Sequence, residues 1–177
     1  MTHLTVSLPS DAGLAEAVGE VSGVTFVPWD LDGPPPAERL DIVVPPYWGG
    51  NRQLAALARA DVRLVQWQSI GFNGVEKYVP TGVPLANAST VHETSTAELA
   101  LALALAAQRG IPEFVRQGDR REWATPTLQS LADRRVLIVG YGGVGKAIEA
   151  RLAGFEVRVD RLARTSRVDR DASGTEV

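Results

Sequence analysis

The 177-residue sequence predicts an α/β fold built on parallel sheets. In the first half of the chain, short apolar segments alternate with helical patterns, which is typical of parallel strands joined by crossover helices. In the second half, an apolar segment leads into a glycine-rich turn and then into another helical pattern. Hydrophobic residues make up 45% of the chain, which is enough to build a core.

Five strands are predicted in the first half of the chain. They span residues 4–8, 24–29, 42–44, 62–67 and 83–86. Ser10 is expected to cap a helix that carries Leu14 and Val18. Asn51 is expected to cap a second helix, which carries Leu54 and Leu57 on its apolar face.

Residues 94–110 are predicted to form one helix. Leucines alternate with alanines there, and alanine favours a helix over a strand. Residues 95–98 match a capping box, and Gly110 followed by Pro112 supplies a stop. Because this helix is apolar on every side, we expect it to be buried in a core or against another subunit. A more charged arm continues to Trp123.

Two domains are predicted, with the boundary near Ser95. The first domain covers residues 1–95 and the second covers residues 96–177. The last stretch, residues 168–177, is polar and is expected to be loose.

The glycine-rich turn carries the strongest functional signal. Residues 136–139 read as a buried strand, and Gly140, Gly142 and Gly145 follow with the spacing G-x-G-x-x-G. The helical pattern after them has one apolar face, made of Val144, Ile148 and Leu152. Strand, turn and helix in this order form the context of a dinucleotide-binding fingerprint. A glycine-rich turn that binds nothing is the alternative.

Each glycine has a separate expected role in that fingerprint. Gly140 permits the tight turn, Gly142 lets the backbone approach a pyrophosphate, and Gly145 lets the helix pack closely on the strand. Unpaired amides and the positive end of the helix dipole then favour the phosphates.

The next predicted strand, residues 157–160, bears on the choice of cofactor. Asp160 follows the glycines by about the number of residues that separates them from the acid that binds the ribose of NAD. Arg164, Thr165 and Arg167 follow, and arginines there suit the 2′-phosphate of NADP. We therefore favour NADP over NAD, with a solvated strand end as the third interpretation of Asp160.

Other candidate sites are few. Gly71, in the loop after the fourth predicted strand, either offers backbone amides to an anion or simply forms a turn. His92 precedes the alanine-rich helix, where a capping or surface role is favoured. The four tryptophans are expected to be packing residues rather than stacking platforms. No metal site is predicted, because there is no cysteine and no histidine cluster.

Composition narrows the expected partners. Eighteen basic and 21 acidic residues give a net charge of -3 without a basic stripe, so nucleic acid is not expected. The longest apolar run, residues 99–107, is too short to span a bilayer. The absence of cysteine and of a signal-peptide pattern leads us to expect a cytoplasmic protein.

Three motifs together resemble one enzyme family. They are the segments 68–75 and 91–103 and the glycine-rich turn. From about Leu4 to Arg167, the chain resembles the D-2-hydroxyacid dehydrogenases, which include phosphoglycerate dehydrogenase and glyoxylate/hydroxypyruvate reductase. The resemblance implies a flavodoxin-like substrate domain followed by the first half of a Rossmann-type parallel sheet. It also implies hydride transfer between a nicotinamide and a 2-keto or 2-hydroxy acid.

The resemblance also implies roles for particular residues. Ile70, Gly71 and Phe72 would face the substrate carboxylate and the nicotinamide. Thr96 would lie beside the cofactor, and Gly143 and Val144 would touch the pyrophosphate.

Two further features follow from the resemblance. The all-apolar helix and its arm look like the family's dimerisation elements, so a homodimer is expected. Ala163 falls at the position of the family's acid, with Arg164 next and Thr165 after it, which again favours NADP.

The chain departs from the family in one respect. The family's catalytic arginine, glutamate and histidine match no residue of this sequence, so no catalytic residue is assigned. Since hydride transfer also needs a group that moves the hydroxyl proton, we expect a truncated, partner-dependent chain that is inactive alone. One alternative is a non-catalytic module that binds nucleotide or dimerises. The other is a flavodoxin-like binding domain with an unrelated tail and no affinity for pyridine nucleotides.

Overall fold

A computed structural model describes residues 3–10, 12–171 and 173–177. The chain divides into two compact units, Met1–Ser89 and Thr90–Val177. Both are built on parallel strands, which confirms the predicted α/β class.

The first unit contains a five-stranded sheet. Its strands are β1 (Leu4–Leu8), β2 (Val24–Pro28), β4 (Ile42–Val43), β6 (Val65–Gln66) and β7 (Leu85–Ala86). They lie in the order β2-β1-β4-β6-β7, and all neighbours are parallel. Numbered along the chain, this order is 2-1-3-4-5, as in flavodoxin-like folds. The sheet therefore has the topology that the resemblance implies.

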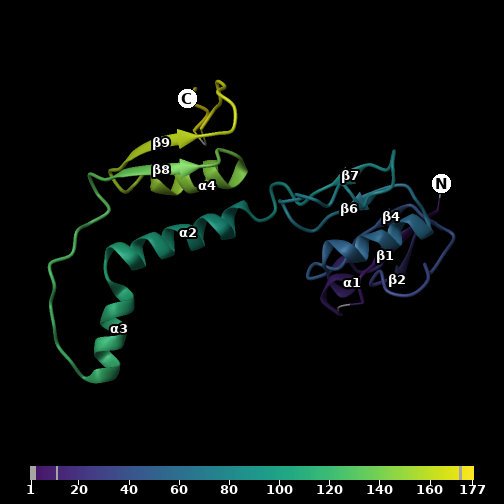
Figure 1. The fold of residues 1–177 in the computed structure, drawn as a ribbon, viewed down its shortest axis with the longest axis horizontal. Coiled ribbons are helices and arrows are strands. Elements are labelled where there is room, and N and C mark those ends of the chain that lie inside the picture. The colour runs from purple at the N-terminus through teal and green to yellow at the C-terminus, as the bar shows by residue number, and fades with distance from the viewer. Residues whose placement is uncertain (1–2, 11, 172) are drawn as a thin grey trace. The chain divides into compact units, whose positions relative to one another are not determined.

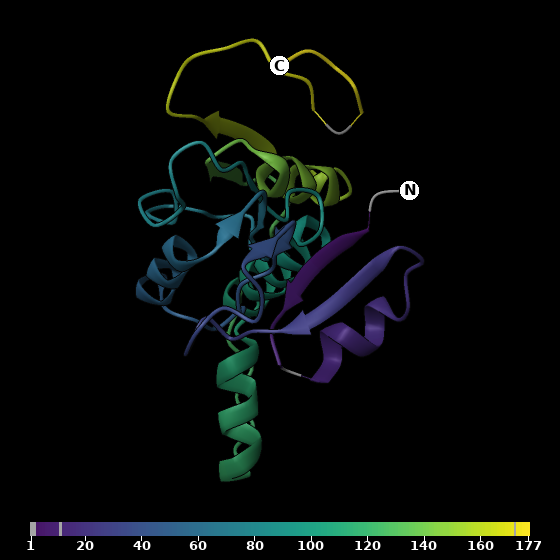
Figure 2. The same cartoon turned by 90° about the vertical axis from the view of Figure 1, so that its right-hand side faces the viewer.

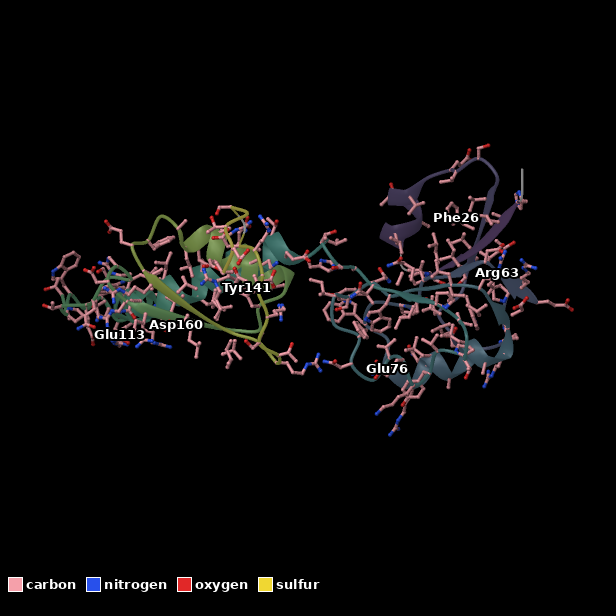
Figure 3. The ribbon with its side chains drawn as sticks, turned by 90° about the horizontal axis from the view of Figure 1, so that it is seen from above. Phe26, Arg63, Glu76, Glu113, Tyr141 and Asp160 are labelled. Carbon is pink, nitrogen blue, oxygen red and sulfur yellow. The ribbon has the colours of Figure 1, made fainter. Side chains whose placement is uncertain are left out.

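Helical segments bury the apolar residues of this sheet. Leu14 of α1 (Ala12–Val18) packs with Val6 and Leu8 of β1, and α1 lies beside the β1–β2 edge (Figure 2). Phe26 of β2 joins the same cluster (Figure 3). A larger core forms under η1, a 3₁₀ helix over Asn51–Arg59. Its fully buried side chains include Leu40, Val43, Leu54, Leu57 and Val65.

Two details of the first unit differ from the prediction. Asn51 does not cap the helix: Gly50 is the N-cap, and no side chain bonds to the helix end. The strand predicted over 62–67 is two strands in different sheets, because β5 (Asp61–Val62) pairs with β3 (Arg39–Leu40) while β6 pairs with β7. Period-2 patterning indicates which face a strand buries but not which neighbour it pairs with.

The second unit is built around a β-α-β element. Strand β8 (Arg135–Val139) leads into α4 (Gly143–Leu152), and β9 (Arg158–Leu162) returns parallel to β8 (Figure 1). Helix α2 (Glu93–Gln108) packs on α4, and α3 (Ile111–Arg120) leaves α2 at a sharp bend (Figure 1). The core of this unit is centred on Ile138, Tyr141 and Leu152.

Helix α2 begins earlier, and is more exposed, than its sequence suggests. His92 is the N-cap and makes no side-chain cap, so the predicted capping box is wrong; the Ser95 hydroxyl instead donates to the His92 carbonyl oxygen at 3.3 Å. Among its described residues only Ala97 is buried, while Leu99 and Leu103 are 60% and 61% exposed. In this chain, then, the helix is not buried in a core.

The described residues near the end of the chain form hydrogen bonds, although their polar composition predicts a loose segment. Asp169 and Val177 exchange two backbone hydrogen bonds of 3.0 and 2.9 Å, and Arg170 and Glu176 form an antiparallel bridge. This turn, with the residues that lead into it, is called the tail below (167–177). The polar side chains here bond to one another and to α4, and composition alone does not indicate such contacts.

Two of the tryptophans also contradict the prediction. Trp29 is buried, whereas Trp48 and Trp123 are almost fully exposed. Within the described residues, no helix is both long and apolar enough to cross a bilayer.

Candidate functional site

The glycine-rich turn connects β8 to α4 through a backbone that only glycine adopts easily. Gly140 has a φ of 99°, in the region that disfavours residues with a Cβ. Its amide donates to the carbonyl oxygen of Leu162 at 2.8 Å, which fixes the turn to the end of β9. The tight turn expected of Gly140 is therefore present.

Gly145 permits close packing of helix on strand. A Cβ at this position would collide with the carbonyl oxygen of Gly140 and would lie 3.2 Å from the Ile138 Cγ2 atom. At Gly142 a Cβ would meet no protein atom within 4 Å, and the φ of −100° is ordinary. The protein itself thus requires glycine at 145 but not at 142, as expected if Gly142 leaves room for a ligand.

The first turn of α4 offers backbone amides. Gly142 is the N-cap, no side chain caps the helix, and Lys146 N donates to Gly142 O at 2.9 Å as the first helical bond. The amides of Gly143, Val144 and Gly145 precede that bond, so the helix supplies them with no acceptor. Such amides, together with the helix dipole, suit an anionic group.

Glu93 of α2 lies directly beside this turn, a contact that sequence reasoning missed. A Cβ at Gly143 would lie 2.5 Å from the Glu93 Oε1 atom. The same oxygen accepts from the Thr90 amide at 2.6 Å. Helix α2 is thereby placed against the start of α4, and a larger residue at position 143 would require the Glu93 side chain to move.

The end of β9 lies beyond Asp160, which corrects the predicted strand boundary. Asp160, labelled in Figure 3, is in the middle of β9, opposite Leu137. Its carboxylate pairs with Arg135 at 2.7 Å. The strand ends at Leu162, so Ala163 is the first residue after it. The Asp160 carboxylate is thus paired with Arg135 of the neighbouring strand β8, and Asp160 does not lie at the end of β9.

Arg164 and Thr165 follow the true strand end and are exposed. Thr165 lines a cavity of about 490 Å³ beside the glycine-rich turn. Other residues around this cavity include Tyr141, Arg161, Ala163, Arg167 and Asp169. The residues expected at the adenosine end of a cofactor are therefore neighbours of the turn.

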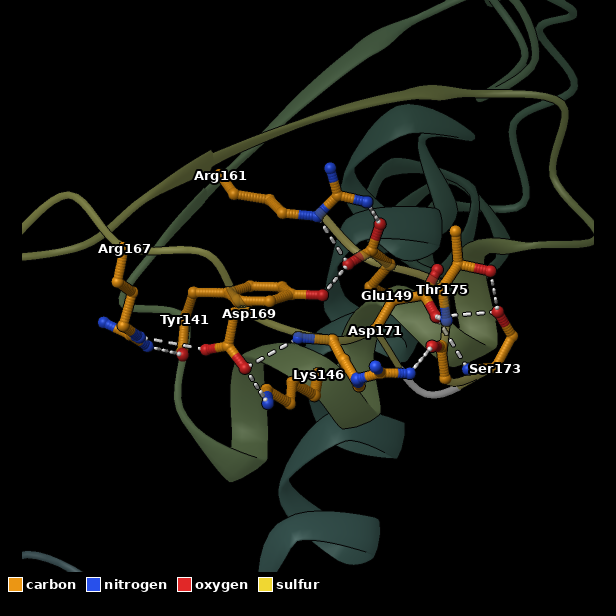
Figure 4. Close-up of polar contacts among 11 residues, drawn as sticks. Tyr141, Lys146, Glu149, Arg161, Arg167, Asp169, Asp171, Ser173 and Thr175 are labelled. Atoms are coloured by element: carbon orange, nitrogen blue, oxygen red, sulfur yellow. Dashed lines mark hydrogen bonds and ion pairs between the residues drawn. The ribbon is translucent and has the colours of Figure 1, made fainter.

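A polar network surrounds Tyr141, and no sequence pattern predicts it. The Tyr141 hydroxyl donates to Glu149 of α4, and Arg161 of β9 also donates to Glu149 (Figure 4). Burial, and then the hydrogen bond to Glu149, raise the pKa of Tyr141 above its usual value. The Lys146 Nζ and Arg161 Cζ atoms lie 5.8 and 5.5 Å from the ring centroid, so two cations also contact the ring.

The tail is attached to the same network. Asp169 accepts from Lys146 Nζ at 2.5 Å and from Arg167 Nε at 3.0 Å. The hydrogen bond from Lys146 is the main reason that the pKa of Asp169 falls to about 2. Arg167 in turn donates to the Tyr141 carbonyl oxygen at 2.6 Å. The tail thus contacts both α4 and the glycine-rich turn.

The second candidate loop belongs to the first unit, at the carboxyl end of β6. Ile70 and Gly71 have their carbonyl oxygens held by Asn87 Nδ2 and Trp67 Nε1, each at 2.8 Å. Phe72 is exposed, and a Cβ at Gly71 would meet nothing within 4 Å. The loop is therefore fixed by side chains at the sheet edge where parallel folds bind ligands.

The remaining predicted site residue, Thr96, is exposed in the first turn of α2, three residues after Glu93. Within the described part of the chain, no group of three or more histidine or acidic residues is arranged to hold a metal ion.

The second unit matches a known protein family. Residues 101–177 match the model described as "D-isomer specific 2-hydroxyacid dehydrogenase, NAD binding domain". The glyoxylate reductase/hydroxypyruvate reductase of Homo sapiens is 28% identical over 163 residues, covering 84% of this chain and 49% of the human protein. A glyoxylate reductase of Thermococcus onnurineus is 32% identical over 115 residues, covering 59% of this chain and 34% of that protein. The chain thus spans about half the length of the human relative, and less of the other.

Solved structures share the fold. An NADPH-dependent glyoxylate/hydroxypyruvate reductase from Sinorhizobium meliloti, in complex with NADP and sulfate, superposes with a TM-score of 0.75 at 22% identity. That match covers 98% of this chain and 58% of the other. A D-isomer specific 2-hydroxyacid dehydrogenase from Xanthobacter autotrophicus Py2, in complex with NADPH and MES, gives 0.70 at 20% identity, covering 94% of this chain and 55% of that one.

Proposed function

We propose a function for this chain on the basis of its family, the D-isomer specific 2-hydroxyacid dehydrogenases. The proposed activity is hydride transfer between a nicotinamide cofactor and a small 2-keto or 2-hydroxy acid, to which this chain contributes the first part of the nucleotide site. One observation carries the proposal. The turn between β8 and α4 combines the left-handed Gly140, the close-packed Gly145 and open space at Gly142.

The pyrophosphate of the cofactor is proposed to accept from the amides of Gly143 and Val144. These amides precede the first hydrogen bond of α4. Gly140, Gly142 and Gly145 shape the turn around that group. When bound, the nicotinamide supplies or accepts the hydride, while the chain's own residues bind and orient it.

NADP is proposed as the preferred nucleotide. Alanine follows the end of β9 at position 163, where an acid would repel a 2′-phosphate, and Arg164 and Thr165 come next. The Sinorhizobium meliloti relative is described as NADPH-dependent, which agrees with this choice for that protein. NAD remains the alternative.

The substrate is proposed to bind in the domain formed by residues 1–95, and the cofactor in residues 96–177. Gly71 and Phe72 would contact the substrate, and Ile70 and Thr96 would contact the cofactor. The support is the fixed loop after β6, whose carbonyl groups are already engaged by Trp67 and Asn87.

The chain by itself is proposed to bind nucleotide in the cytoplasm without turning over substrate. No residue here is matched to a proton donor, and hydride transfer to a keto acid requires one. Exposed leucines on α2 favour a homodimer. A non-catalytic module that binds nucleotide and dimerises is the second candidate, and the same exposed leucines favour it.

The test is a fluorescence titration of the purified chain with NADPH and NADH, with glyoxylate and hydroxypyruvate added afterwards. Gly142→Ala should weaken binding by about tenfold or more while leaving the fold intact, because the new Cβ meets no protein atom. Gly154→Ala, whose Cβ also meets open space, is the matched control. Wild-type chain with no affinity for either nucleotide would overturn the proposal. Turnover of either acid would overturn the claim of inactivity.

A further inference from the structure

The loop that follows β9 is attached to the glycine-rich turn at both of its ends. At its start, the Gly140 amide donates to the Leu162 carbonyl oxygen at 2.8 Å. At its finish, Arg167 Nη2 donates to the Tyr141 carbonyl oxygen at 2.6 Å. The residues proposed to meet the adenosine end of the cofactor lie between these two points. Their position therefore depends on both attachments.

The second attachment is organised by Asp169. Its Oδ2 atom accepts from Arg167 Nε at 3.0 Å, and its Oδ1 atom accepts from Lys146 Nζ at 2.5 Å (Figure 4). The Arg170 amide also donates to Oδ1 at 2.8 Å. Because Lys146 belongs to α4, the carboxylate joins the end of the loop to the helix that follows the turn. One side chain thus connects the loop, the turn and α4.

We infer that Asp169 is a positioning residue that sets the preference of this site for a 2′-phosphorylated nucleotide. It holds Arg167 on the Tyr141 carbonyl group and so fixes the loop that carries Arg164 and Thr165. This inference rests on the proposed function, since it concerns the same nucleotide site.

The physical reason is preorganisation. A guanidinium offers five donors in a rigid plane, so a carboxylate on one edge fixes where the other edge points. Without Asp169, Arg167 would lose the partner that orients it and the loop would have one firm attachment instead of two. A loop that must be ordered during binding lowers affinity, and here the loss falls on contacts with the 2′-phosphate. NADH carries an uncharged hydroxyl group instead of a phosphate at that position, so its affinity changes less.

The experiment measures dissociation constants for NADPH and NADH in the wild-type chain and three variants. Asp169→Asn should raise the NADPH constant by about fivefold to tenfold and the NADH constant by less than about twofold. Asp169→Glu keeps the charge and should restore part of the preference. Asp171→Asn is the matched control, because it removes the same charge from the same tail. In the wild-type chain, the Asp171 carboxylate bonds to Ser173 and Thr175 instead of α4.

Hydrogen–deuterium exchange gives a readout that needs no nucleotide. In Asp169→Asn, amides of residues 163–167 should exchange faster, while those of β8 should keep the wild-type rate and so report an intact fold. The same amides should be unaffected in Asp171→Asn.

The outcomes separate this inference from the proposed function. An unchanged NADPH-to-NADH ratio in Asp169→Asn, or an equal change in Asp171→Asn, overturns the positioning role and leaves the proposed function standing. A wild-type chain that binds neither nucleotide overturns both. A selective loss of NADPH affinity, partly restored in Asp169→Glu, supports the inference.

Discussion

The carboxylate of Glu93 occupies the space above Gly143, with its Oε1 atom 2.5 Å from where a Cβ at position 143 would lie. Helix α2 is in this way packed against the beginning of the helix that forms the candidate nucleotide site. Gly145 is restricted differently, since its absent Cβ would meet the backbone of Gly140. One neighbour is a flexible side chain and the other is a fixed carbonyl group, so substitutions at the two glycines should differ in cost.

We expect Gly145→Ala to destabilise the second unit by about 1–3 kcal/mol, because the Gly140 backbone cannot move without opening the turn. Gly143→Ala should cost less, about 1 kcal/mol, since the Glu93 side chain can rotate away. Urea unfolding, monitored through hydrogen exchange of the β8 amides, measures the loss of stability in both variants. Glu93→Ala combined with each variant is the control: it should relieve Gly143→Ala but not Gly145→Ala. Equal costs at the two positions would contradict this explanation.

The attachment of the tail to α4 should be lost in acid. The pKa of Asp169 is lowered to about 2, mainly because Lys146 donates a hydrogen bond to its carboxylate. A carboxyl group with a depressed folded pKa contributes stability above its unfolded value of about 3.9, and that contribution is lost as the pH falls through the folded value. NMR shifts of the Asp169 and Val177 amides should therefore change between about pH 4 and about pH 2. Asp169→Asn should abolish this step, and a carboxyl midpoint near 4 would argue against the ion pair.

The exposed leucines of α2 should support self-association. Leu99 and Leu103 are four residues apart and so lie on one face of the helix. We expect Leu103→Glu to shift sedimentation from dimer to monomer, because a charge cannot be buried in an apolar interface without a partner. Val18→Glu adds the same charge at an exposed position of α1 and serves as the control. A wild-type chain that sediments as a monomer at every concentration would refute the homodimer.

Asp160 should have little influence on the choice of nucleotide. Its carboxylate pairs with Arg135 in the middle of β9, and both side chains are well exposed. Asp160→Asn should cost at most about 1 kcal/mol of stability, as is usual for exposed ion pairs. The ratio of NADPH to NADH affinity should stay at the wild-type value in the same titration. Selective loss of NADH binding in this variant would instead assign Asp160 to the ribose.

The sequence predicted the elements with strong local signals and missed those set by distant contacts. Residues 136–145 combine an apolar strand with glycines whose steric requirements are local, so the turn was predictable. Asn51 is a capping residue type, but residue type alone does not show where a helix begins, and here the N-cap is Gly50. The apolar pattern over 62–67 predicts one continuous strand, since only the pairing of Asp61–Val62 with Arg39–Leu40 divides it.

The candidate site shows the same division. Gly140 and Gly145 could be predicted from their spacing alone. Glu93 and Asp169 could not, because each acts across the fold on a residue far away in the chain, Gly143 and Lys146 respectively. A lone acid in a polar stretch gives no pattern that distinguishes such a contact from a solvated surface.

The bend at Gly110 determines how the segment from α3 to residue 130 behaves. Gly110 has a φ of 63°, and a Cβ there would lie 2.7 Å from the Leu128 Cδ1 atom. The Gln117 side chain accepts a hydrogen bond from the Ala124 amide, and the Gln108 side chain donates one to the Ser130 carbonyl oxygen, each at 3.3 Å. The segment that returns from α3 is therefore hydrogen-bonded to both helices. These contacts hold residues 124–130 against α2 and α3. A side chain at position 110 would therefore have to adopt a left-handed backbone and displace Leu128, so this glycine permits both the bend and the packing of the returning segment.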